Sequence, residues 1–344
     1  MNPFALFMII SSLAIGTITT LSSFHWILAW IGLEINTLAI IPLMTKNPHP
    51  RSIEATTKYF LTQATASALI LFSCTLNAWL TGEWTINNLT NPLSTTLMTI
   101  ALLTKLGVAP FHFWLPEVLQ GLTLQTGLIL STWQKLAPMA LLFQLSQSLN
   151  LNMMLLLGLI STFVGGWGGI NQTQIRKILA FSSISHLGWM VAILKISPEL
   201  YLLNFTLYII MTSTTFYMFL SINSKSLSQL TTAWPKIPTL IAFALLSLLS
   251  LSGLPPLTGF LPKWLIAQEL IKQNLTLFAF LILMSTLLSL FFYLRLTYMI
   301  SLTLAPNPSF SASLWPMKKK NILSIPLLLT LCLLPLSPTL FLFT

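Results

Sequence analysis

Four charged side chains lie inside long apolar runs of this sequence, where a membrane interior would surround them. Glu34, Lys105, Lys135 and Lys263 are each several helical turns away from the nearest polar loop. A charge at the centre of a bilayer costs roughly 2.5–3.5 kcal/mol on insertion scales. Ionisable side chains at such depth mark ion or proton pathways, so a proton path is the leading hypothesis for the chemistry of this chain.

Glu34 and Lys105 have the chemistry of a switchable pair. Glu34 lies about ten residues into its predicted helix, and Lys105 directly precedes the sequence Leu106-Gly107 in another apolar segment. Burial disfavours the charged form of a carboxyl or an amine, whereas a nearby opposite charge favours it. The two side chains are therefore expected to pair and to control the charge of a neighbouring lysine. The alternatives are a structural ion pair between two helices and, for Lys105, packing as a neutral amine.

The remaining titratable groups in apolar segments suit a relay. Lys135 has no acid close to it in sequence, which fits a central relay residue, and Lys263 fits the terminal one. His186 and His112 are candidate relay residues because histidine changes charge near neutral pH. The alternatives are a Lys135 side chain that reaches an interface, a Lys263 close to the membrane surface, and histidines with a purely structural role.

The composition places these residues in a polytopic all-α membrane protein. The 344 residues are 55% hydrophobic and only 6% charged, whereas soluble domains carry about 25% charged residues. The net charge of +10 does not indicate nucleic-acid binding, because the basic residues fall in short predicted loops between apolar spans. The sequence also has no nucleotide-binding loop, zinc motif or disulfide framework, so we expect no redox centre on this chain.

Eleven spans are expected, since a membrane-crossing helix needs about 20 apolar residues. Two of them, residues 94–119 and 238–272, contain Gly and Pro residues that break the helical backbone ladder, so both are predicted to be interrupted. The predicted spans are residues 3–23, 24–45, 56–80, 94–119, 121–147, 150–171, 178–195, 199–222, 238–272, 275–302 and 322–343.

Loop charges orient these spans. One side of the predicted topology collects ten basic residues and the other only Lys195 and Lys272, which places the N-terminus inside and the C-terminus outside by the positive-inside rule. The ten residues are Lys46, Arg51, Lys58, Arg176, Lys177, Lys225, Lys236, Lys318, Lys319 and Lys320.

An internal repeat becomes visible when the sequence is shifted by 146 residues. Gly107 then meets Gly253, and Pro110 meets Pro256. Each repeat holds five predicted helices, residues 3–147 and 150–302, and one C-terminal helix at 322–343 completes a single domain over residues 1–344. Because five is odd, the second repeat is expected to cross the membrane in the inverted sense, as in transporters built from inverted repeats with discontinuous helices.

Several motifs resemble one known family. They are Gly32-Leu-Glu34-Ile-Asn, Thr104-Lys-Leu-Gly-Val-Ala-Pro-Phe-His-Phe-Trp-Leu-Pro-Glu117, Ser131-Thr-Trp-Gln-Lys135, Phe181-Ser-Ser-Ile-Ser-His-Leu-Gly188 and Ser252-Gly-Leu-Pro-Pro-Leu-Thr-Gly-Phe-Leu-Pro-Lys263. With them the chain resembles, from end to end, the mitochondrially encoded antiporter-like membrane subunits of NADH:ubiquinone oxidoreductase, respiratory complex I. The wider family includes multi-subunit cation/proton antiporters.

The resemblance implies a function, a location and partners. It implies proton translocation coupled to electron transfer elsewhere in the complex, with Glu34 and Lys105 as the acid–lysine pair, Lys135 as the central relay and Lys263 as the terminal lysine. NAD, FMN, iron-sulfur clusters and ubiquinone are expected on other subunits. The expected location is the inner mitochondrial membrane, with the N-terminus in the matrix and the C-terminus in the intermembrane space. Other antiporter-like and small membrane subunits and phospholipids, cardiolipin among them, are the expected partners.

A stand-alone secondary cation/proton antiporter is the alternative function, because repeats and buried lysines serve either protein. Sodium-dependent proton flux through the purified chain alone would favour this alternative. A third possibility is a scaffold whose buried charges only pair helices.

Overall fold

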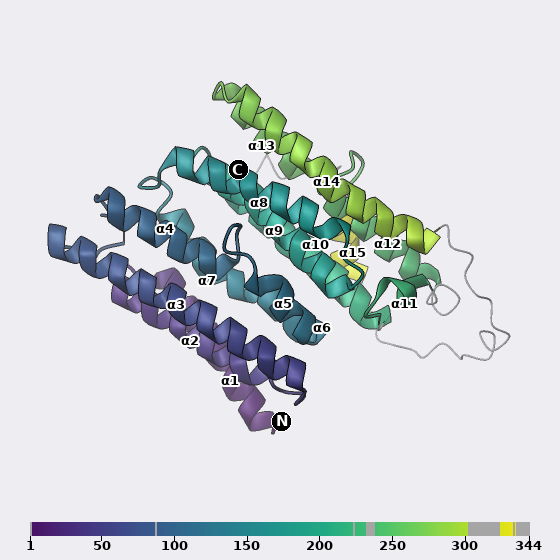
Figure 1. Cartoon of the computed structure of the whole chain (residues 1–344), viewed down its shortest axis with the longest axis horizontal. Coiled ribbons are helices and arrows are strands. Elements are labelled where there is room, and N and C mark those ends of the chain that lie inside the picture. Colours follow the sequence, from purple (N-terminus) through teal and green to yellow (C-terminus); the bar gives the residue numbers. More distant parts are fainter. Residues whose placement is uncertain are drawn as a thin grey trace. The chain divides into compact units, whose positions relative to one another are not determined.

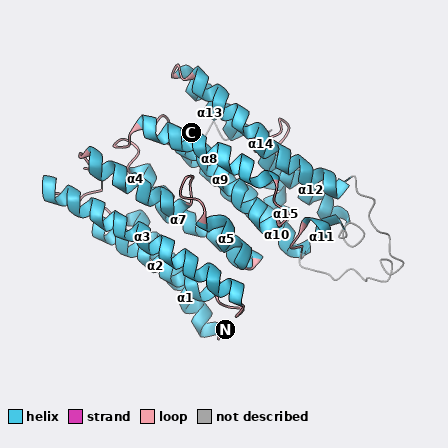
Figure 2. Ribbon diagram, in the orientation of Figure 1, coloured by secondary structure: helices cyan, strands magenta, loops and turns pink. Residues whose placement is uncertain are grey.

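The computed structural model describes residues 2–86, 88–222, 224–231, 238–301, 324–332 and 334. Lys236, Lys318–Lys320 and most of the predicted helix at 322–343 lie outside the described residues. Within the described ranges the chain is helical, with loops and two isolated bridge pairs (Figure 2). It divides into two compact units, Met1–Ser161 with Leu194–Pro198 and Thr162–Ile193 with Glu199–Thr344.

The first unit begins with three long helices that run side by side, α1, α2 and α3 (Figure 1). Helix α3 also packs against the two segments α4 and α5, and α7 packs against α4, α1 and α2. The bounds of these helices are α1 Pro3–Ser22, α2 Trp26–Met44, α3 Pro50–Thr81, α4 Pro92–Leu106, α5 Trp114–Gly121, α6 Leu124–Ser131 and α7 Trp133–Gln144.

Local sequence signals define where these helices start and stop. Asn2, His25 and His49 each accept a backbone N–H at a helix start, and a proline occupies the first helical position of α1, α3 and α4. Proline suits that position because its missing N–H would be unpaired there in any case. Helices α3 and α4 both end at a left-handed glycine, Gly82 and Gly107, as helices commonly do.

The second unit contains α9 and the helices that follow it, together with the C-terminal half of α8. Helix α14 packs against α9, α11, α12 and α13, and α15 packs against α12. The bounds are α8 Leu151–Ile170, α9 Ile175–Ile193, α10 Pro198–Ile222, α11 Leu227–Thr231, α12 Pro238–Ser252, α13 Phe260–Lys272, α14 Thr276–Ser301 and α15 Ser324–Cys332.

Both predicted interruptions are present. Helix α4 stops at Leu106 and α5 starts at Trp114, while α12 stops at Ser252 and α13 starts at Phe260. Gly107 and Gly253 begin the two breaks with φ angles of 75° and 82°, which L-residues with a side chain rarely adopt. The bounds of α12 are those of α4 shifted by 146 residues at both ends. The five-helix inverted repeats remain a prediction, supported by this coincidence.

The surface is that of a membrane protein. Among the residues that the structure describes, six helices are long and apolar enough to span a bilayer, namely α1, α2, α3, α8, α10 and α14. Large apolar side chains face outward, for example Phe4 at 78% and Phe7 at 68% exposure. The bounds differ from the predicted ones mainly at helix starts. Helices α3 and α9 begin earlier than expected, so Arg51, Arg176 and Lys177 lie within helices instead of loops.

Candidate functional site

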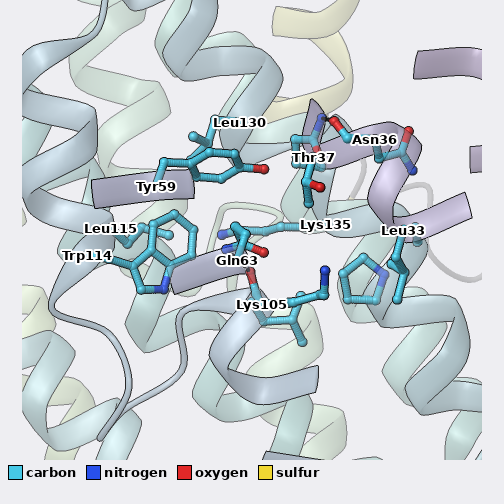
Figure 3. A pocket seen from close by; sticks show the side chains of 14 residues that line it. Leu33, Asn36, Thr37, Tyr59, Gln63, Lys105, Trp114, Leu115, Leu130 and Lys135 are labelled. Carbon is cyan, nitrogen blue, oxygen red and sulfur yellow. Dashed lines mark hydrogen bonds between the residues drawn. The ribbon is translucent and has the colours of Figure 1, made fainter. Parts of the chain in front are cut away.

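A small polar cavity lies in the first unit and is lined by two of the predicted lysines. Lys105 reaches it from α4 and Lys135 from α7, with exposures of only 6% and 3%. Figure 3 shows both side chains at the cavity together with the polar side chains of Tyr59 and Gln63 from α3. Two amines with hydroxyl and amide groups around them form the kind of polar cavity that can hold water.

Lys105 occupies the last turn of α4, two residues before the glycine that starts the break. A cation suits this place because the C-terminal end of a helix carries partial negative charge. Its Nζ atom has no hydrogen-bond partner among the described residues. The amine is therefore placed at the cavity without being fixed by a protein acceptor.

Glu34 lies half-buried near the middle of α2. Its carboxylate accepts a hydrogen bond of 2.9 Å from the Thr37 hydroxyl and interacts electrostatically with Lys105 and Tyr59. Within the described ranges, Glu34 and Lys105 form no direct ion pair. The structure thus brings the predicted partners into electrostatic range, with Thr37 as the near neighbour of the carboxylate.

Lys135 is positioned by the first turn of α7. The preceding residue, Gln134, donates a 3.2 Å hydrogen bond to the backbone oxygen of Asn36 on α2, and Pro138 lies one turn further along α7. These contacts join the helix of Lys135 to the helix of Glu34. The predicted central lysine is therefore held in the same unit as the predicted acid–lysine pair.

A second small polar cavity lies in the other unit, and His186 of α9 and Lys263 of α13 both line it. Its remaining lining residues are Thr162, Ser185, Trp189, Thr286 and Ser289. Ser185 and Ser289 donate their hydroxyl protons to carbonyls of their own helices. Hydroxyl oxygens that donate in this way keep lone pairs for a donor such as water or an amine.

Lys263 is anchored to the second break. Its Nζ atom donates a 2.7 Å hydrogen bond to the backbone oxygen of Ser252, the last residue of α12. A Cβ atom on the adjacent Gly253 would lie only 2.8 Å from this amine. The glycine thus leaves the room that the lysine occupies.

Glycines on α8 allow the helices around this cavity to approach closely. A Cβ atom on Gly165 would lie 2.7 Å from the Ser185 nitrogen of α9, and one on Gly166 would lie 2.7 Å from Leu288 Cβ of α14. Both neighbouring helices contribute lining residues to the cavity. Small residues at helix contacts serve this purpose in membrane proteins.

Two weaker candidates lie elsewhere. His112 is in the first break, as predicted, buried at 6% exposure with its ring 4.3 Å from that of Phe113, and it is not a lining residue of the Lys105 cavity. Glu117 on α5 forms a 2.6 Å ion pair with Lys58, which also forms an ion pair with Glu54. All three side chains of that cluster are at least 41% exposed, so Glu117 forms a surface ion pair.

Sequence reasoning missed Gln63 and Trp114 as parts of the site. Tyr59 and Gln63 are four residues apart on α3, a spacing that puts both on one helix face. The sequence shows this spacing, but it does not show which helices the shared face of α3 packs against.

Known proteins are similar to this chain both in sequence and in fold. A family model described as NADH:quinone oxidoreductase/Mrp antiporter, TM, matches residues 23–289, and a model described as NADH dehydrogenase subunit 2 C-terminus matches residues 290–341. The chain belongs to the NADH:quinone oxidoreductase/Mrp antiporter family.

Individual members of this family are similar over their length. The NADH-ubiquinone oxidoreductase chain 2 of Xenopus laevis is 61% identical, over 98% of this chain and 99% of the relative. A chain of respiratory complex I from Thermus thermophilus with bound aureothin superposes with a TM-score of 0.85 and 28% identity, over 99% of this chain and 80% of that one. A chain of the Mrp complex from Dietzia sp. has a TM-score of 0.77 at 19% identity, over 83% and 58%, which shows the fold alone.

These comparisons confirm the resemblance and the all-helical antiporter-like fold. They also confirm the function, that of an antiporter-like membrane subunit of NADH:ubiquinone oxidoreductase.

Proposed function

We propose that this subunit moves protons through its buried lysines, with Glu34 and Lys105 as the controlling pair, Lys135 as the central relay residue and Lys263 as the terminal one. The observation that carries the proposal is the polar cavity shared by Lys105 and Lys135 next to a broken helix. Non-helical backbone at membrane depth is stable only where protein or a wet cavity surrounds it. His186, at a cavity with Lys263, acts as a further relay residue.

The energies involved are of the right size. Opposite charges about 4 Å apart attract by about 4 kcal/mol at an effective dielectric constant of about 20, and by about half that at twice the distance. Moving one proton against about 100 mV requires about 2.3 kcal/mol. A change in separation between Glu34 and Lys105 therefore supplies the energy of one such step to a neighbouring lysine.

The energy source lies on other subunits. The relatives are chain 2 of NADH-ubiquinone oxidoreductase, which supports a location in the inner mitochondrial membrane. The placement of the N-terminus in the matrix rests on the loop charges. NAD, FMN, the iron-sulfur clusters and ubiquinone are then bound elsewhere in the complex. Neighbouring membrane subunits and anionic phospholipids contact the apolar outer faces of this chain and deliver the conformational or electrostatic change.

Replacing Lys135 by Met tests the proposal. In the assembled enzyme in membrane vesicles, Lys135→Met removes the amine but keeps an unbranched side chain, so the number of protons pumped per electron pair is expected to fall. Lys46→Met is the matched control, because Lys46 is exposed at the end of α2, and it should pump like the wild type. An unchanged ratio in assembled Lys135→Met enzyme would show that the buried charges only pair helices.

The comparisons favour this function over a stand-alone antiporter. The relative at 61% identity is an NADH-ubiquinone oxidoreductase chain, and the similarity extends over almost its whole length. The similarity to the Mrp complex concerns the fold alone.

A further inference from the structure

The carbonyl groups freed at the first break receive side-chain donors from two other helices. The last carbonyls of a helix have no partner within the helix itself. Here the Thr104 oxygen accepts a 3.2 Å hydrogen bond from the Gly107 nitrogen and a 3.0 Å one from the Trp114 indole Nε1 of α5. The Gln63 amide of α3 donates a longer one, 3.5 Å, to the Lys105 oxygen. The two peptide groups that flank the Lys105 Cα atom thus each accept a hydrogen bond from a neutral side chain.

These two donors are themselves fixed in place. Gln63 and Trp114 are 4% and 8% exposed, and both line the Lys105 cavity. The Tyr59 ring, one turn before Gln63 on α3, packs edge-on against the Trp114 ring with 5.7 Å between centroids. At the far end of α5, a Cβ atom on Gly121 would lie 2.6 Å from Ala55 Cβ. One face of α3, at positions 55, 59 and 63, therefore braces the broken helix.

We infer that Trp114 and Gln63 are positioning residues for Lys105, which aim its amine into the cavity by holding the Thr104 and Lys105 carbonyls. The need for such residues follows from the lysine itself, since its Nζ atom has no hydrogen-bond partner among the described residues. The position of the Lys105 backbone therefore decides whether the side chain can reach the cavity. This inference rests on the proposed function, in which Lys105 belongs to the controlling pair.

The second break is held in a different way, which clarifies the role of the first. There the carbonyl of the last α12 residue, Ser252, receives the amine of Lys263 itself. At the first break, neutral side chains instead donate to the carbonyls of Thr104 and Lys105, two residues and one residue before the end of α4. The amine of Lys105 is left available to the cavity and to the charge of Glu34.

Trp114→Phe and Gln63→Met test the inference in the assembled enzyme. Each keeps the approximate size of the side chain and removes one hydrogen-bond donor. Losing one such bond lowers the population of the correctly aimed lysine about fivefold, so the number of protons pumped per electron pair should fall toward the Lys105→Met value. NADH oxidation and the amount of assembled enzyme should be retained. Trp79→Phe is the matched control, because Trp79 on α3 is 85% exposed.

The outcomes separate this inference from the proposed function. If Lys105→Met lowers the pumping ratio but Trp114→Phe and Gln63→Met do not, the positioning role is wrong and the relay survives. The variants could instead lose assembly, NADH oxidation and pumping equally, with the pumping ratio constant, or both could fail to assemble. Either result would assign these residues a purely structural role and overturn the inference. An unchanged ratio in Lys105→Met would instead sink the proposed function.

Discussion

At the scale of single residues, the structure separates charges inside the protein from charges at its surface. Lys105 and Lys135 are nearly inaccessible and line a polar cavity. Glu117 and Lys58, by contrast, form an ion pair with side chains 52% and 41% exposed. A buried charge is kept at a cost that only function or a fixed partner offsets. We therefore expect the inner group to carry the chemistry and the surface ion pair to be dispensable for it.

Replacing Glu117 by Gln tests this separation. Exposed ion pairs contribute little to stability, so Glu117→Gln enzyme is expected to assemble and to pump protons per electron pair as the wild type does. Glu34→Gln, which removes the half-buried carboxylate near Lys105, should lower that ratio. If the Glu117→Gln enzyme pumped as few protons per electron pair as the Glu34→Gln enzyme, the surface ion pair would belong to the proton path.

Residue types predicted part of the site. Charged groups in apolar runs are visible in a sequence because the bilayer makes them exceptional, which is why Glu34, Lys105, Lys135 and Lys263 could be found. Gln63 and Trp114 could not, since an amide or an indole in a membrane helix is ordinary. Their role depends on which carbonyls they meet across two helices, and those contacts are remote in sequence.

At the scale of elements, the broken helices organise each unit. Helices α4 and α12 each end in a left-handed glycine, and a lysine is positioned next to each break. Glycine and proline signals predicted both interruptions. They did not predict that Lys263 would turn back to the end of α12, because that depends on the fold of the seven-residue segment between α12 and α13. The start of α3 at Pro50 was also missed, since the polar residues of its first turns resemble a loop.

A substitution at the second glycine tests the element-scale account. Gly253→Ala forces a residue with a side chain into a left-handed conformation, which costs about 1–2 kcal/mol, and places a Cβ atom against the Lys263 amine. We expect less assembled enzyme and a lower ratio of protons to electrons.

Gly82→Ala is its control. Gly82 has a similar φ angle of 74°, but a Cβ atom there would meet nothing within 4 Å. This variant should show the backbone strain alone, with less assembled enzyme and an unchanged pumping ratio. Equal pumping ratios in the two alanine variants would mean that the contact between Gly253 and Lys263 has no functional role.

At the scale of the whole molecule, each compact unit contains a broken helix and a polar cavity with a lysine. The sequence shift of 146 residues predicted corresponding breaks, and the bounds of α4 and α12 agree with it. The polar residues do not follow the repeat, since Lys105 corresponds to Leu251 and Lys263 to Glu117. The repeat therefore accounts for the framework, but not for the positions of the buried charged residues.

Proton movement through hydrated cavities at the buried lysines can be checked in a high-resolution map of the assembled enzyme. We expect ordered water in contact with Lys105 and Lys135 in the first unit and with His186 and Lys263 in the second. Dry cavities, or lysine side chains that face lipid acyl chains, would contradict it.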